Sequence, residues 1–170
     1  MALTNDNITL MGKKVTINGA ALKVGQTVPP FKLTANDMSD LSSDTFNGQV
    51  LILSVVPSLD TPVCSEQTKK FNAELEKLPG VVVLTVSRDL PFAQKRWCGA
   101  ANATKVTTAS DYKYRTFGAA FGAEMVEAAL LARAVFVVDK KGIVQHVEYV
   151  NEVATEPDYM KALAVAKELA

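Results

Sequence analysis

The amino-acid sequence predicts an α/β fold in which a mixed central sheet is flanked by helices. Short, mostly apolar runs recur at 50–56, 81–86 and 134–138, with Ser54 as the polar exception in the first and Thr85 in the second. Such runs are typical of strands that are covered on both faces. Helix-start signals at Pro62 and Pro91 follow the first two runs, so strand and helix alternate along the middle of the chain.

Length and composition indicate one ordinary globular domain. The 170 residues predict a single domain, 1–170, with 48% hydrophobic and 21% charged residues. Because 18 basic residues balance 18 acidic ones, no basic face is expected, which argues against nucleic acid as a partner. No apolar run reaches membrane-spanning length, and the first twenty residues lack a signal-peptide block. We therefore expect a cytoplasmic protein whose two cysteines are reactive or simply buried.

Residues 1–20 predict an N-terminal β-hairpin extension. Apolar residues alternate at 8–10 and at 15–17, on either side of a turn at 11–14. A short strand at 31–33, a polar loop at 36–44 and a turn at Asn47-Gly48 then lead to the central strand.

The rest of the chain alternates helices and strands. The expected elements are a helix from Pro62 to Pro79-Gly80, a strand at 81–86, a helix from Pro91 capped by Gly99, a strand at 105–109, a helix at 112–121, a flexible loop at 118–132, strands at 134–138 and 143–150, and a helix at 158–169. This order, βαβ followed by ββα, matches a thioredoxin-like fold.

Cys64 is placed where a helix begins. With Thr61 as N-cap and Pro62 as the first helical residue, Cys64 is the third helical residue. The N-cap hydroxyl normally accepts the backbone N–H of that position, and a capping box puts a glutamate there. Here a thiol occupies this anion-favouring position, where unpaired N–H groups and the helix dipole favour a thiolate.

The helix start alone is too weak to make a thiol reactive. Moving a cysteine's pKa from about 8.5 to near 6 requires roughly 3.4 kcal/mol, whereas a helix terminus supplies at most about 2 kcal/mol. A fixed cation is therefore needed, and Arg133 is the best candidate because its neighbours at 130–138 are apolar. The alternative is a strand-entry arginine that pairs with a carboxylate. Arg88 is a weaker candidate, because Asp89 offers it a local partner.

Cys98 is expected near the C-terminal end of its helix, two turns after Pro91, where the dipole disfavours a thiolate. We therefore interpret Cys64 as the nucleophile and Cys98 as the resolving thiol, which condenses with a sulfenic acid that a peroxide forms on Cys64. The alternative is two inert core cysteines, since free cysteine is among the most buried residue types. The helix start argues against that alternative for Cys64, and less so for Cys98.

These segments together resemble the peroxiredoxins, and within them the bacterial thiol peroxidases of the atypical two-cysteine type. Pro57-x-x-x-Thr61-x-x-Cys64 matches the active-site motif of that family. Segments 87–99, 131–135 and 156–159 are similar to its resolving-cysteine segment, its arginine segment and its tail, so the similarity covers essentially the whole chain. Arg88 departs from the family pattern, in which a small residue is expected. Either Arg88 is a surface variant, or its charge perturbs the local electrostatics, and the sequence does not choose between the two.

The resemblance implies an enzyme that reduces hydrogen peroxide and organic hydroperoxides at Cys64, with no metal or organic cofactor. It implies that Thr61 and Arg133 bind the peroxide oxygens, where they polarise the O–O bond, and that Pro57 shields the thiolate. It further implies an intrachain disulfide between Cys64 and Cys98, reduction of that disulfide by thioredoxin, and a homodimer.

The implied disulfide carries a conformational prediction. Both helices are expected to start at the same edge of the sheet, and two turns place Cys98 about 10 Å further along its helix axis. A disulfide needs Cα atoms within roughly 7 Å of each other. We therefore expect disulfide formation to unwind part of one or both helices.

Other chemistries fit the sequence less well. A thioredoxin-type oxidoreductase needs Cys-x-x-Cys, but Gln67 stands three residues after Cys64. A Cys–His hydrolase needs a base, and the only histidine, His146, lies mid-strand and is expected to face solvent. Two cysteines and one histidine also make a poor zinc site. A non-enzymatic redox sensor with the same cysteines stays open, and turnover with a reductant distinguishes it from an enzyme.

Aromatic side chains bear on which hydroperoxide is preferred. One interpretation is that these aromatic side chains line an apolar approach that favours alkyl or lipid peroxides. The other, which is favoured, is that they pack in the core. The residues concerned are Phe92, Trp97, Phe117 and Phe121.

Overall fold

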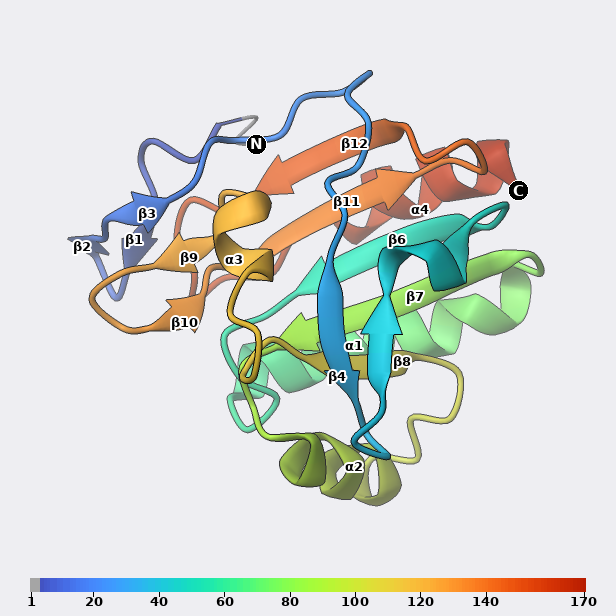
Figure 1. Cartoon of the computed structure of the whole chain (residues 1–170), viewed down its shortest axis with the longest axis horizontal. Coiled ribbons are helices and arrows are strands. Elements are labelled where there is room, and N and C mark those ends of the chain that lie inside the picture. The colour runs from blue at the N-terminus through green and yellow to red at the C-terminus, as the bar shows by residue number, and fades with distance from the viewer. Residues whose placement is uncertain (1–3) are drawn as a thin grey trace.

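A seven-stranded mixed sheet organises the structure, a computed structural model that describes residues 4–170 (Figure 1). β6, β7 and β8 run parallel, whereas β11 and β12 on one side and β4 and β5 on the other pair antiparallel. The predicted mixed sheet is confirmed. Its strands, in spatial order, are β12 (Val144–Tyr149), β11 (Ala134–Val138), β6 (Val50–Val55), β7 (Val81–Ser87), β8 (Thr107–Ser110), β4 (Lys32–Ala35) and β5 (Asp40–Ser42).

The central strands β6 and β7 are covered on both faces. Every residue of β6 is buried, and β7 is buried except at Val82, which is half-buried. Leu53 packs in one hydrophobic core and Ile52 in the other, because successive side chains of a strand point to opposite faces. Coverage on both faces explains why these runs are mostly apolar.

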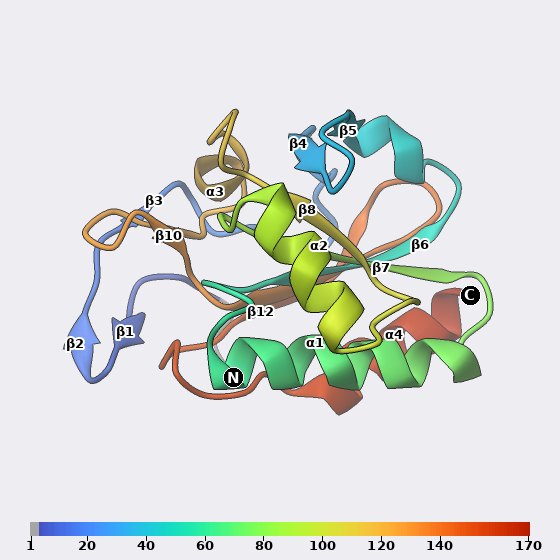
Figure 2. The same cartoon turned by 90° about the horizontal axis from the view of Figure 1, so that it is seen from below.

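Helices cover one face of the sheet more extensively than the other. α1 and α4 lie on one side, and α3 lies on the other (Figure 2). None of the helices within residues 4–170 has the length and apolar character that crossing a membrane requires. The α-helices of this part of the chain are α1 (Pro62–Glu74, followed by a 3₁₀ turn at Leu75–Lys77), α2 (Pro91–Ala100), α3 (Phe117–Ala120) and α4 (Tyr159–Leu169).

The helices that carry the two cysteines begin at the same edge of the sheet. The parallel strands β6 and β7 point the same way in Figure 1, and α1 and α2 follow them directly. Pro62 and Pro91 occupy the first helical positions, as predicted. Gly99, the predicted cap of α2, lies inside that helix instead. The chain reverses at Asn102, with φ of 55°, because asparagine also tolerates the left-handed conformation.

Two segments that were expected to be loops contain strands. The loop predicted at 36–44 includes β5, followed by a 3₁₀ turn at Ser43–Phe46. The loop predicted at 118–132 contains β9 (Glu124–Met125) and β10 (Leu130–Leu131), which form an antiparallel hairpin. The helix predicted at 112–121 shrinks to the four residues of α3. Elements this short show too few residues for a recognisable period.

The N-terminal hairpin is confirmed, with a tighter turn than predicted. β1 (Thr9–Leu10) pairs with β2 (Lys13–Lys14) through Met11-Gly12, whose φ values of 53° and 78° suit a two-residue turn. Ile17 does not return along this hairpin; it lies in β3 (Ile17–Asn18), which pairs with β9. Residues 1–3 of the predicted extension lie outside the described part of the chain.

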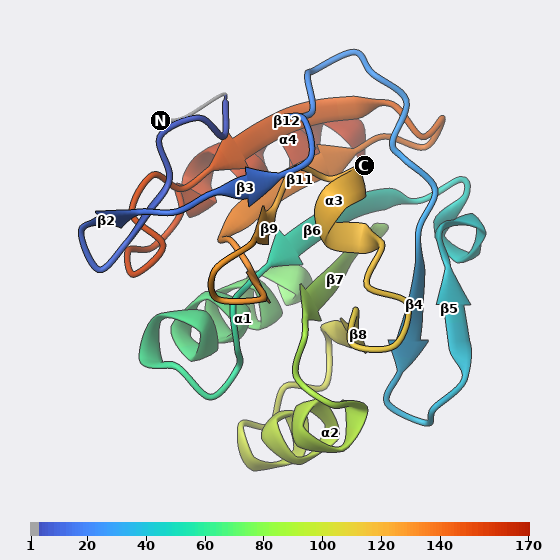
Figure 3. The ribbon, with the colours of Figure 1, turned by 60° about the vertical axis from the view of Figure 1, so that its left-hand side comes forward.

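The hairpin is attached to the segment that follows β12, and Figure 3 shows the two side by side. Glu152 accepts hydrogen bonds from the backbone N–H groups of Met11 and Gly12 at 3.0 and 2.9 Å. The backbone N–H of Val153 donates to the Thr9 carbonyl at 2.9 Å. These bonds fix the position of the Val153 carbonyl, which belongs to the candidate active site.

Candidate active site

Cys64 is the third residue of α1, as predicted, and its side chain is fully buried. Thr61, in an extended conformation, is the N-cap, and Pro62 opens the helix. Within residues 4–170, the backbone N–H groups of Val63 and Cys64 donate no hydrogen bond to another protein group. Two donors at the positive end of the helix are therefore left available beside the sulfur.

Arg133 meets Cys64 across 69 residues of chain. Arg133 lies between β10 and β11 in the chain and is buried, with 2% of the residue exposed. The Nη2 group donates to the Cys64 Sγ at 3.2 Å. The strand-entry alternative, a pairing with a carboxylate, is not found, because the ion pairs formed by residues 4–170 do not include Arg133.

Two further hydrogen bonds fix the Arg133 guanidinium. Its Nε donates to the Val153 carbonyl and its Nη1 donates to the Gln67 Oε1, both at 2.8 Å. Gln67 in turn donates from Nε2 to the Ser54 hydroxyl at 2.8 Å. Both of these acceptors are neutral groups. No negative charge among them therefore offsets the positive charge that the guanidinium presents to the Cys64 sulfur. The arrangement presents a fixed cation to Cys64.

The Thr61 side chain differs from the expected cap. Its hydroxyl donates to the Ser58 carbonyl at 2.9 Å and makes no hydrogen bond to the start of α1. The residue is exposed, beside the opening of the turn 57–60. Pro57 begins that turn and is buried. The Thr61 hydroxyl therefore lies at the helix entrance without occupying the N–H groups beside the sulfur.

Cys98 lies near the end of α2, as predicted, and is half-buried. Its sulfur lies 3.6 Å from the Thr108 hydroxyl. Burial raises the pKa of the Cys98 thiol above its usual range, although the Thr108 contact acts in the opposite direction. The residue lines a surface cleft of about 390 Å³ that Asn36 and Ser39 border from the other side. Both cysteines are free thiols, and both helices are intact.

Arg88 is neither a surface residue nor a partner of Asp89. Only 4% of its side chain is exposed. It forms ion pairs with Asp111 at 3.3 Å and Glu124 at 2.7 Å, and donates to the Ala129 carbonyl at 2.8 Å. Burial raises the pKa of Asp111, against the opposing effects of the Phe117 N–H and of Arg88. Arg88 therefore joins β7 to the β9–β10 hairpin rather than serving Cys64.

The sequence profile of the Redoxin family matches residues 23–163, which include every candidate site residue. The chain belongs to the Redoxin family.

Relatives within the Redoxin family match over nearly the whole chain. A thiol peroxidase of Halalkalibacterium halodurans is 50% identical over 161 residues, covering 95% of this chain and 97% of that protein. A thiol peroxidase of Bacillus subtilis is 48% identical over 162 residues, with coverage of 95% and 97%. Among solved structures, a peroxiredoxin-like protein from Aquifex aeolicus has a TM-score of 0.93 at 40% identity, covering 99% of this chain and 100% of its own.

A more distant structure shares the Redoxin fold. A thiol peroxidase from Chromobacterium violaceum, 14% identical, has a TM-score of 0.86 over 95% of both chains. The thioredoxin-like fold is therefore confirmed, as are the predicted family and the prediction of an enzyme of the peroxidase class.

The competing chemistries find little support in this Redoxin-family chain. His146 is buried, with 8% exposed, contrary to the expected solvent-facing position, and this burial lowers its pKa. The hydrogen bonds of Cys64 involve Arg133 and Thr68 within residues 4–170, and none involves His146. Over the same residues, no group of three or more metal-ligating side chains comes together.

The aromatic residues divide between core and surface. Phe117 and Phe121 stack in the core with ring centroids 4.1 Å apart, away from any approach to the sulfur. Trp97 is buried and donates from its indole to the Ser65 hydroxyl at 3.2 Å, linking α2 to α1. Phe92, with 64% exposed, is the one of the four that faces solvent.

Sequence reasoning missed two residues that hold Arg133. Gln67 served only to reject a Cys-x-x-Cys motif, yet its position three residues after Cys64 places both on the same helix face. Ser54 is the polar exception in β6 and faces Gln67 from the sheet. A polar residue in an apolar strand and another on the buried face of the next helix are the signals that locate this pair.

Proposed function

We propose that this Redoxin-family protein is a thiol-specific peroxidase that reduces hydrogen peroxide and organic hydroperoxides to water and alcohols. The 3.2 Å contact between Arg133 Nη2 and Cys64 Sγ carries the proposal. A fixed guanidinium and a helix start act on one buried sulfur and together favour the thiolate, which is the reactive form of cysteine.

The first step is attack of the Cys64 thiolate on one peroxide oxygen. The O–O bond breaks, the sulfur is oxidised to a sulfenic acid, and the other oxygen leaves with a proton as water or alcohol. Negative charge develops on that leaving oxygen, and Arg133 and the N–H groups of Val63 and Cys64 are the donors that stabilise it. Thr61 contributes its hydroxyl to peroxide binding, and Pro57 shields the thiolate from water.

In the second step Cys98 attacks the sulfenic sulfur, which gives an intrachain disulfide and releases water. Cys64 is buried at a helix start and Cys98 lies two turns into α2, so parts of α1, α2 or both unwind for this bond to form. Thioredoxin returns the disulfide to two thiols. We place this single-domain chain, 1–170, in the cytoplasm, and we infer a homodimer because the family resemblance implies one.

The test is stopped-flow consumption of peroxide by wild type, Cys64→Ser and Cys98→Ser, each with reduced thioredoxin. The proposal requires continuous turnover by wild type and none by Cys64→Ser. Cys98→Ser is expected to react once and then stall, because its sulfenic acid has no intrachain partner. A redox sensor uses the same cysteines without turnover. If wild type oxidises once but thioredoxin sustains no further consumption, the sensor is correct and the enzyme proposal is wrong.

A further inference from the structure

Asp89 contacts the turn that precedes α1, although it belongs to the junction between β7 and α2. Its Oδ1 accepts the Ser58 hydroxyl at 2.7 Å, and its Oδ2 accepts the backbone N–H of Leu59 at 2.8 Å. Both donors lie in the turn 57–60, between the central strand and the helix of Cys64. The carboxylate therefore holds the entrance of α1 from a neighbouring segment.

The same carboxylate is part of the junction that starts α2. Oδ2 also accepts the Ser87 hydroxyl at 2.7 Å. Ser87 Oγ in turn accepts from Nε2 of Gln94 at 3.0 Å, and Gln94 is a buried residue of α2. The Ser110 hydroxyl donates to the Asp89 carbonyl, which attaches β8 to the junction. Asp89 is thus bonded to the turn that precedes the Cys64 helix and, through Ser87, to the Cys98 helix.

We propose that Asp89 is a positioning residue that holds the Cys64 turn on the start of the Cys98 helix, and that it controls how a sulfenic acid on Cys64 is consumed. The proposal rests on the peroxidase function above and names a determinant of its second step. We use the term Asp89 bridge for the hydrogen bonds from Ser58, Leu59 and Ser87 to this carboxylate.

Two reactions compete for the Cys64 sulfenic acid. In the first, Cys98 displaces the sulfenic oxygen, which leaves as water while the S–S bond forms. In the second, another hydroperoxide transfers one oxygen to the sulfur, which becomes a sulfinic acid, and the hydroperoxide leaves as water or alcohol. The first reaction needs α1, α2 or both to unwind locally, whereas the second proceeds with both helices in place. An intact Asp89 bridge slows the first reaction relative to the second.

The bridge also acts before any sulfenic acid exists. It fixes the turn 57–60 that precedes Thr61, so it sets the position of the Thr61 hydroxyl and of the unbonded N–H groups of Val63 and Cys64. Small displacements of a reacting group are enough to lower rates by tens of times or more. Loss of the bridge is therefore expected to slow the peroxide reaction and to accelerate disulfide formation, which are opposite effects on consecutive steps.

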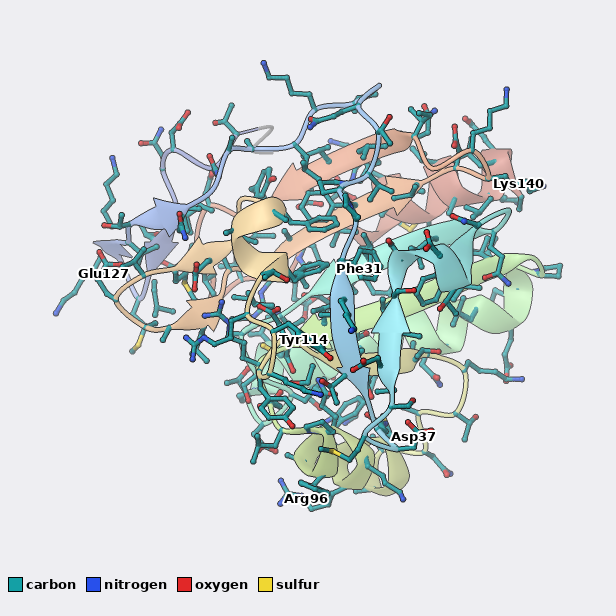
Figure 4. The ribbon with its side chains drawn as sticks, viewed as in Figure 1. Phe31, Asp37, Arg96, Tyr114, Glu127 and Lys140 are labelled. Atoms are coloured by element: carbon teal, nitrogen blue, oxygen red, sulfur yellow. The ribbon has the colours of Figure 1, made fainter. Side chains whose placement is uncertain are left out.

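The experiment compares Asp89→Ala and Asp89→Asn with wild type in single turnovers followed by tryptophan fluorescence. Trp97 is the chain's single tryptophan and links α2 to Ser65 of α1, so it reports on both steps. Asp139→Ala is the matched control. Asp139 also organises a turn, by accepting the N–H groups of Lys141 and Ile143, but at the end of β11 remote from Arg133. Figure 4 shows that turn at Lys140, well away from Arg96 on α2.

For Asp89→Ala we expect the peroxide phase to slow about tenfold and the disulfide phase to accelerate about tenfold. Asp89→Asn keeps an acceptor for Leu59 and is expected to fall between wild type and Asp89→Ala. At high peroxide, mass spectrometry should find less sulfinic acid on Asp89→Ala than on wild type. Ser58→Ala, which removes one bond of the bridge, should shift both phases in the same directions by smaller factors.

Three outcomes overturn the proposal. The first is an Asp89→Ala protein whose two phases and sulfinic fraction equal those of wild type. The second is a uniform slowing of both phases, which indicates general destabilisation; if Asp89→Ala does not fold, Ser58→Ala decides alone. The third is a wild-type protein that forms no disulfide, in which case the proposed function itself is wrong. If wild type and Asp139→Ala both turn over normally and Asp89→Ala behaves like them, the proposed peroxidase function is retained. Only the proposed role of Asp89 is then wrong.

Discussion

Gln67→Glu tests whether the charge of Arg133 is what activates Cys64. The substitution is nearly isosteric and places a carboxylate oxygen where an amide oxygen now accepts from Nη1 at 2.8 Å. Because Nη2 lies 3.2 Å from the sulfur on the same guanidinium, the new charge sits roughly 7 Å from the sulfur. At an effective dielectric constant of about 20, a unit charge at that distance disfavours the thiolate by about 2 kcal/mol.

The assay is the pH dependence of the peroxide reaction in single turnovers. An added negative charge favours the neutral thiol, so the rate should reach half its plateau at a higher pH, by about one to two pH units. At neutral pH the variant should be about tenfold or more slower and should recover at alkaline pH. The plateau itself should change little, because the introduced carboxylate keeps the hydrogen bond that orients Arg133.

Asn72→Asp is the control for adding a carboxylate to α1. Asn72 accepts the N–H groups of Lys105 and Val106 through Oδ1, and an aspartate accepts the same bonds. It lies eight residues beyond Cys64, about 12 Å along the helix, so its pH profile should match that of wild type. A Gln67→Glu profile that also matches wild type would refute the electrostatic reasoning.

Three more predictions concern other parts of the chain. Arg88→Met should lower the free energy of unfolding by about 3 kcal/mol, because it leaves buried Asp111 without its cation. Urea denaturation measures this free energy. As a control, Arg96→Met removes an exposed ion pair and should change the free energy of unfolding by less than about 1 kcal/mol. In Cys64→Ser, alkylation of Cys98 should be slow at pH 7 and should keep rising with pH beyond the usual pKa range of a thiol, because burial raises the pKa of this group. A rate that levels off below pH 8 contradicts this. Hydrogen bonds from Ala154, Gly12, Thr9 and Met11 hold the pKa of Glu152 at about 2, against a usual 4.5, so its stabilisation is complete above pH 4.5 and lost as pH falls toward 2. Thermal unfolding of Glu152→Gln should therefore vary less than wild type between pH 5 and pH 2, and equal slopes would exclude this role.

The sequence was most informative where a pattern is long and local. The apolar runs of β6, β7 and β11 and the Pro62 and Pro91 helix starts were predicted within one or two residues. β5, β9 and β10 escaped because two or three residues cannot display a period, and their pairing depends on partners far along the chain. Local propensity does not encode such pairing.

The candidate site shows the same limit. An arginine among apolar residues indicates a buried anionic partner, and the structure places Arg133 on Cys64. Adjacency in the sequence suggested Asp89 as a local partner for Arg88, but the partners of Arg88 are Asp111 and Glu124 from other elements. Asp89 instead reaches back to Ser58. Proximity in the sequence therefore gave wrong partners for both Arg88 and Asp89, because the partners of buried charges depend on positions in the folded structure.

The attachment of the β1–β2 hairpin to Glu152 has a practical consequence for handling this protein. The hairpin holds the segment whose Val153 carbonyl accepts from Arg133, so we expect a displacement of β1 to reach the guanidinium that contacts the Cys64 sulfur. We therefore expect surface immobilisation or fusion of a bulky carrier ahead of β1 to disturb the candidate active site. Coupling through the exposed Ala170 at the end of α4 avoids that route and is the better site for electrodes, resins or reporter tags.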